Sequence, residues 1–190
     1  MTPMDLVPSW YAPSFTAIWK CPAPSKVNAF AWQLLHDRIP TRQDLYRRRI
    51  IGGGGDTSCV LCGEVSESSA HLFIYCDVAL KVWVGVFEWL DIPFSLPHNL
   101  FSILNHLIQT GGKKLRKGLC MIWNATVWSL WRRWNSVMFD NGRRDTADVL
   151  DEIKVLTWKW WLSQSEVAHS LLYEWRVQPK LCVENCLEFD

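Results

Sequence analysis

The sequence predicts a mostly α-helical protein, in which a helical domain with a Cys3His zinc-binding loop is followed by a Trp-rich helical region. Apolar residues recur at intervals of three and four in several segments after residue 24, which is the spacing of one helix face. Residues 59–76 place Cys and His at metal-ligand spacing, and most of the 13 tryptophans follow residue 80. These observations favour helices fixed by a metal in one place and by aromatic packing elsewhere.

Turn and helix-breaking residues divide the chain into four predicted parts. Residues 1–24 are expected to be a Pro-rich leader, and residues 25–92 a zinc-binding domain. Residues 98–176 form the Trp-rich helical region, and residues 177–190 an acidic tail. The leader is predicted to stay out of regular helix because of Pro3, Pro8, Pro13, Pro22 and Pro24.

Two helices are predicted before the metal loop. Ser25 is typical of an N-cap, and the helix that it begins must end at Pro40. Its apolar stripe consists of Val27, Phe30, Ala31, Leu34 and Leu35. Thr41 and Asp44 resemble a capping box with Asp in place of Glu, so a short helix is expected from there to about Arg49.

The loop itself reads C-x2-C-x8-H-x4-C, formed by Cys59, Cys62, His71 and Cys76. Three thiolates and one imidazole are the closed ligand shell of a structural Zn²⁺ site, with no position open for substrate. Such ligands favour zinc over magnesium or calcium, with iron as the less favoured alternative. A redox C-x-x-C pair and buried, non-ligating cysteines are the other interpretations of these residues.

Helix geometry constrains the second half of the loop. Residues five apart on a regular helix diverge by about 140°, so His71 and Cys76 should be separated by a turn or break. Asp77 is the predicted N-cap of the following helix, which ends near Leu90. The glycine run at 52–55 lacks the ending of a phosphate-binding loop, and we interpret it as a link into the metal loop.

Three more helices are expected in the Trp-rich region. The first covers residues 100–108 and is stopped by Gly111 and Gly112, and the second covers residues 113–139. The long helix has a stripe typical of a core, formed by Trp123, Val127, Trp131, Trp134 and Met138. Thr146 is expected to cap the third, whose inner face is predicted to carry Val149, Leu150, Ile153, Leu156 and Trp160.

The net charge of +1 hides an uneven distribution, with basic residues concentrated in segments 20–50 and 113–144 and acidic residues after position 144. The sequence starts without the features of a signal peptide, and no apolar run is long enough for a membrane span. With three of the seven cysteines assigned to metal, and Cys182 and Cys186 left unassigned, we expect a reducing compartment, nucleus or cytoplasm, and no membrane partner.

The order of motifs over about residues 18–83 resembles the zinc-binding domain of plant LINE-type (non-LTR) reverse transcriptases. The stretch runs W-K, P-x-K, F-x-W, P-T-R, C-x2-C, H-L-F, C and W, and WSLWRRWNSVMFDN at 128–141 resembles the segment that leads toward a ribonuclease H domain in such elements. Trp134 stands where that pattern usually has Arg. The polymerase's Y-x-D-D carboxylates are absent, which predicts a non-catalytic, retrotransposon-derived chain.

Three functions follow as hypotheses. The favoured one is binding of RNA or DNA, with Trp32 or Tyr46 stacking on a base. The basic residues expected to contact phosphates are Arg38, Arg42, Arg47, Arg48 and Arg49. The alternatives are a protein-interaction or regulatory module that docks a partner through its Trp-rich helices, and a retroelement remnant without selected activity.

Overall fold

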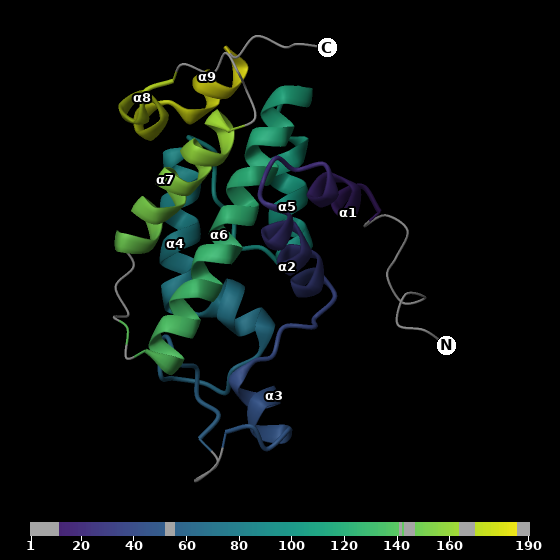
Figure 1. Cartoon of the computed structure of the whole chain (residues 1–190), viewed down its shortest axis with the longest axis vertical. Helices are drawn as coiled ribbons and strands as arrows, with labels where there is room; N and C mark the ends of the chain where they lie inside the picture. The colour runs from purple at the N-terminus through teal and green to yellow at the C-terminus, as the bar shows by residue number, and fades with distance from the viewer. Residues whose placement is uncertain (1–11, 52–55, 141, 143–146, 164–169, 186–190) are drawn as a thin grey trace.

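The computed structural model describes residues 12–51, 56–140, 142, 147–163 and 170–185, and within these ranges it is built from helices (Figure 1). In chain order they are α1 Ala12–Trp19, α2 Ser25–Leu35, α3 Arg42–Arg47, the π-helical turn η3 His71–Tyr75, α4 Asp77–Trp89, α5 Leu100–Gln109, α6 Lys113–Phe139, α7 Ala147–Leu162, α8 Leu172–Val177 and α9 Pro179–Glu184. The predicted mostly α fold is therefore confirmed. No helix among the described residues has the length and apolarity to cross a membrane.

The long helix α6 is the axis around which the others pack. It contacts α1, α2 and α5 as well as α4, α7 and α9, and Figure 1 shows α3 and the metal loop at the opposite end of the molecule from α8 and α9. Residues 118–127 are buried on every side, as expected for a helix that is apolar all round. The metal loop is thus attached to one end of a tightly packed helical core.

Tryptophan provides much of the core volume. Trp83, Trp123, Trp134 and Trp175 are each at most 1% exposed, and the buried cluster joins residues from both predicted helical parts of the chain. Several indole N–H groups find acceptors on neighbouring elements, as Trp175 does on Thr157 Oγ1 (3.1 Å). Most of the described tryptophans therefore serve internal packing.

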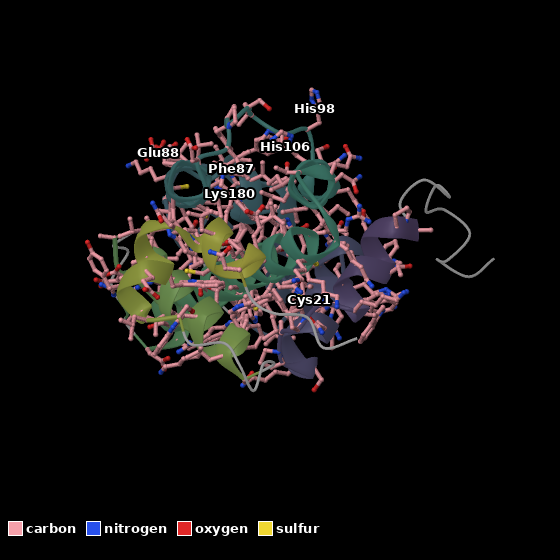
Figure 2. All side chains as sticks on the ribbon, turned by 90° about the horizontal axis from the view of Figure 1, so that it is seen from above. Cys21, Phe87, Glu88, His98, His106 and Lys180 are labelled. Atoms are coloured by element: carbon pink, nitrogen blue, oxygen red, sulfur yellow. The ribbon has the colours of Figure 1, made fainter. Side chains whose placement is uncertain are left out.

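The histidines on and before α5 differ in their surroundings. His106 stacks on Phe87 with ring centroids 5.7 Å apart, and the carbonyl of His98 accepts a hydrogen bond from the Tyr75 hydroxyl (2.9 Å). Figure 2 shows both histidines on the side of α5 that faces away from Cys21 and the N-terminal helices.

Several predicted helix boundaries are confirmed. The Thr41–Asp44 capping box forms in full at α3, α5 ends just before Gly111, whose φ is 94°, and α6 covers residues 113–139 as expected. Two predicted N-caps, Ser25 and Asp77, are wrong by one residue. Each is the first helical residue, and the N-cap positions of α2 and α4 are occupied by Pro24 and Cys76.

Other expectations are corrected by the structure. The leader contains a helix, α1, in which Pro13 lies in the first turn, where a missing N–H costs nothing. The helix α2 ends at Leu35, before Pro40, and Asp37 takes a positive φ of 51°. Within residues 177–190, for which only an acidic tail is predicted, the structure describes α9. The glycine run at 52–55, Thr146 and Cys186 lie outside the described residues.

The inner face of α7 also differs from the prediction. Val149 and Ile153 are buried as expected, but the stripe continues through Thr157 and Trp161, while Leu156 and Trp160 are only half-buried. The buried residues recur at every fourth position, and Thr157 fits among them because its hydroxyl bonds the Ile153 carbonyl (2.8 Å) and the Trp175 indole. Hydrophobicity alone does not reveal a satisfied buried threonine.

Candidate metal centre

The first two ligands lie on a tight turn whose backbone is held by its own hydrogen bonds. An isolated antiparallel bridge pairs Ser58 with Ser66, and inside it the Cys59 N–H donates to the Val65 carbonyl (2.8 Å). The Gly63 N–H closes the turn on the Cys59 carbonyl (2.7 Å), with φ of 78° at Gly63, a conformation that glycine adopts without strain. This geometry places the Cys59 and Cys62 sulfurs on the same side.

The other two ligands are separated by a break in helix geometry, which confirms the prediction. His71 begins the π-helical turn, whereas Cys76 is extended (φ −66°, ψ 134°) and its N–H closes the turn on the His71 carbonyl (2.7 Å). The buried indole of Trp83 donates to the Phe73 carbonyl (2.8 Å) and so fixes this turn to α4. The wider turn and the extended residue bring two side chains together that a regular helix would turn apart.

The four side chains converge as a single ligand set. Their ligand atoms all lie within 4.8 Å of one another, with Cys59 Sγ 3.9 Å from Cys76 Sγ and Cys62 Sγ 3.3 Å from His71 Nε2. Ligand bonds of about 2.3 Å to sulfur and 2.0 Å to nitrogen would give separations of roughly 3.8 and 3.5 Å in a tetrahedral zinc site. The predicted Cys3His group is therefore positioned to bind a metal.

The protonation states in this cluster are unequal. The Cys59 thiol donates a hydrogen bond to Cys76, which raises the pKa of Cys59 well above its ordinary value and lowers the pKa of Cys76. Burial lowers the pKa of His71 below 6.5, so its imidazole stays neutral. A neutral imidazole and a thiolate are the forms that bind metal, and Cys59 must release its proton when a metal enters.

A buried carboxylate, Glu67, connects this loop to the rest of the molecule. Its side chain is inaccessible to solvent and accepts three N–H donors, from the backbone of Arg42 (2.7 Å), the backbone of Val60 (3.1 Å) and the indole of Trp134 (2.8 Å). These donors belong to α3, the metal loop and α6. Because hydrogen bonds to a buried charge are strong and expensive to leave unmade, Glu67 ties the three elements together.

Sequence reasoning missed Glu67, since a glutamate in a polar loop between metal ligands is usually exposed to solvent. The one available signal was Trp134, which stands at a position where the resembling elements usually have Arg. The structure gives that position a role, because the Trp134 indole N–H bonds the Glu67 carboxylate (2.8 Å).

The five arginines predicted to bind nucleic acid are not equivalent. Arg42 is committed internally: its guanidinium donates to the Ser58 carbonyl (3.0 Å) and pairs with Asp56 (3.2 Å). Arg38 lies over the Trp32 ring at 5.4 Å, and Arg47 pairs with Asp44 at the surface (3.3 Å). Both remain exposed, as do Arg48 and Arg49.

The two predicted stacking residues also differ. Trp32 is half-buried and its ring is occupied by His36, with centroids 4.4 Å apart, and by the Arg38 guanidinium. Tyr46 is 44% exposed on α3, next to the exposed arginines. Of the two, Tyr46 has the more accessible ring.

The fold and this ligand set define a class, a helical protein with a candidate Cys3His metal centre at one end of its core. Within that class, residues 9–83 match the family described as zinc-binding in reverse transcriptase, so this part of the chain is similar to that zinc-binding domain. The match covers less than half of the chain and ends at Trp83, inside α4.

One curated relative is a putative ribonuclease H protein of Arabidopsis thaliana, 28% identical over 115 aligned residues. The alignment covers 47% of this chain and 18% of the relative, so the chain corresponds to a minor part of that protein. No solved structure matches the chain.

Proposed function

We propose that the chain is a non-catalytic module from a plant LINE-type retrotransposon, which holds a structural Zn²⁺ and binds RNA or DNA beside it, in the nucleus or cytoplasm. The observation that carries the proposal is the run of exposed arginines at the end of α3, on an element that Glu67 and the Arg42 hydrogen bonds fasten to the metal loop. A metal that orders this loop would also hold the arginines in place, because the two share these contacts.

The charge distribution around α3 supports phosphate binding. Arg48 and Arg49 follow the helix and have no ion-pair partner among the residues that the structure describes, while Tyr46 offers an exposed ring beside them. Arginine fits phosphate oxygens with paired N–H donors, and aromatic rings stack on unpaired bases. Arg42 belongs to the supporting structure, so we assign the contact to Arg38, Arg47, Arg48 and Arg49.

The chemistry of the ligand set that the described residues form supports a non-catalytic role. Among the described residues, the group of His, Cys, Asp and Glu placed to share a metal is the Cys3His set. Two-metal phosphoryl chemistry needs carboxylates that converge on cations, and a closed Cys3His shell leaves no position for a reacting water.

The test is binding of single-stranded RNA and DNA as a function of salt concentration. We expect the double variant Arg48→Gln/Arg49→Gln to weaken binding and to lower the slope of log K against log salt by about 1.4, since each phosphate contact contributes roughly 0.7 on a single strand. The matched control is Lys81→Gln/Lys159→Gln, which removes the same charge from exposed positions on α4 and α7. Equal losses in both variants would contradict the assignment.

One observation supports a protein-interaction function, but it does not involve the tryptophans that this hypothesis expects to be exposed. The tryptophans of the Trp-rich region are buried or half-buried, and Trp19 is the one described tryptophan among the exposed large apolar residues. Exposed apolar residues gather instead before and on α8 and α9: Leu171, Tyr173, Val177 and Leu181. Tyr173→Ser/Leu181→Ser should abolish such binding to a partner protein and leave RNA binding unchanged.

A further inference from the structure

A second basic surface lies at the other end of α6 from the metal loop. There α1, the end of α5 and the first turns of α6 enclose a cavity of about 740 Å³, and Figure 1 shows α1 beside the end of α6 that is remote from α3. Its lining residues are Ala12, Pro13, Thr16, Ala17, Lys20, Ile108, Lys113, Arg116, Lys117 and Cys120. The volume falls within the range of ligand sites, about 300–1,000 Å³.

The rim of this cavity is strongly cationic. Four of its lining residues are basic and none is acidic, and all four cations are exposed. Within the described parts of the chain, none of the four forms an ion pair. Among the described residues, the charges therefore repel one another without compensation from a neighbouring carboxylate.

The position of the cations on α6 increases this imbalance. Lys113, Arg116 and Lys117 occupy the first two turns, and the first turn contains no acidic residue. The positive end of a helix dipole disfavours cations and favours anions. A ligand with at least two negative charges would remove both sources of repulsion.

The apolar part of the lining, which we call its floor, is of a different kind. It consists of small or aliphatic residues and one cysteine: Ala12, Pro13, Ala17, Ile108 and Cys120. Cys120 is 1% exposed, and Figure 2 places its neighbour in the fold, Cys21, where the N-terminal helices meet α6. Such a floor accepts an apolar or planar group, while inorganic phosphate alone would leave it empty.

We propose that this cavity binds a nucleotide, with its phosphates on Arg116, Lys117 and the neighbouring lysines and its base and sugar against the apolar floor. The nucleotide can be free, or it can be an end or unpaired residue of a nucleic-acid strand. The site goes beyond the proposed function, because it lies far from the metal loop. Lys117 lines the cavity, Trp134 bonds Glu67 in the metal loop, and the two are 17 positions, or about 26 Å, apart along α6. The α3 arginines can therefore fail to bind while this cavity still does.

The experiment measures the affinity of the full, zinc-loaded chain for fluorescent methylanthraniloyl-ADP. Arg116→Gln/Lys117→Gln should lower the affinity by about tenfold or more, as expected when two phosphate-contacting charges are removed. Thr16→Trp leaves every charge in place and fills the cavity with a bulky side chain from an exposed position on α1. This variant should therefore abolish binding as well. The matched charge control Lys81→Gln/Lys159→Gln should retain affinity within about twofold.

Competition then distinguishes the two sources of the ligand. Displacement of the probe by unlabelled ADP and not by a 5′-phosphorylated oligonucleotide indicates a free nucleotide, and displacement by both indicates a strand. Binding that Thr16→Trp leaves intact, or a loss in the Lys81/Lys159 control equal to that in the Arg116/Lys117 variant, would show general charge attraction and overturn the proposal. No binding of the probe by the unaltered chain would also overturn it.

Discussion

The metal loop and the middle of α6 are stable for different reasons. Residues 118–127 of α6 are buried on all sides among apolar and aromatic neighbours, so the hydrophobic effect is sufficient to hold them. The conformation of the loop from Ser58 to Cys76 depends on one isolated β-bridge, on hydrogen bonds to Glu67 and on four ligand side chains. It has too little regular structure to hold its shape by local hydrogen bonds.

This difference predicts that the two regions respond separately to loss of metal. A small metal-binding unit gains much of its folding energy from the metal, since the ligands converge only in the folded state. The core of α6 contains none of the four ligands, and α6 packs against α5 and α7. The loop should therefore unfold locally while the helical core remains.

The largest effect is expected from Cys59→Ser. The variant should lose zinc and lose hydrogen-exchange protection over residues 58–76 and α3, because a serine hydroxyl does not replace the thiolate. Protection in residues 118–127 should persist. Metal analysis and hydrogen exchange with mass spectrometry measure both responses. Cys182→Ser, the same change outside the ligand set, should retain one zinc per chain; zinc retained by Cys59→Ser would refute the site.

A smaller effect is expected from acid. Because the Cys59 pKa is raised, metal binding displaces at least its proton, and zinc affinity should fall at least about tenfold per pH unit below neutrality. Burial lowers the pKa of His71 below its ordinary value of 6.5. The contribution of the neutral imidazole to stability is therefore complete above pH 6.5 and is lost as the pH falls through the lowered pKa. Competition with a chromophoric chelator from pH 8 to 5 measures this, and a flat profile would contradict it.

The smallest effect concerns the link between the two regions. Trp134→Phe removes the indole N–H that Glu67 accepts (2.8 Å) and should lower the free energy of unfolding by about 1–2 kcal/mol more than Trp123→Phe. Trp123 is the matched control, because it is equally buried and its indole N–H has no acceptor among the described residues. Denaturant unfolding of both zinc-loaded variants gives the difference, and equal costs would remove the proposed role of the Glu67 bond.

The pattern of residues along the chain was sufficient to predict those structural features that a single physical rule determines. The Thr41–Asp44 capping box and the limits of α6 were predictable because short-range hydrogen bonds and helical spacing determine them. The α1 helix was not predicted, because Pro13 was treated as a helix breaker although a first-turn position tolerates it. On α7, Thr157 was missed because its burial depends on a donor from α8.

For the metal centre, the sequence by itself determined the ligand types, their spacing and the need for a break between His71 and Cys76, since these follow from coordination chemistry and helix geometry. Only the tertiary structure decided that Glu67 is buried, that Arg42 is committed to the loop and that four cations surround a cavity beside α1. The reason is that burial and charge pairing depend on elements far apart in the chain, and spacing along the chain carries no information about those contacts.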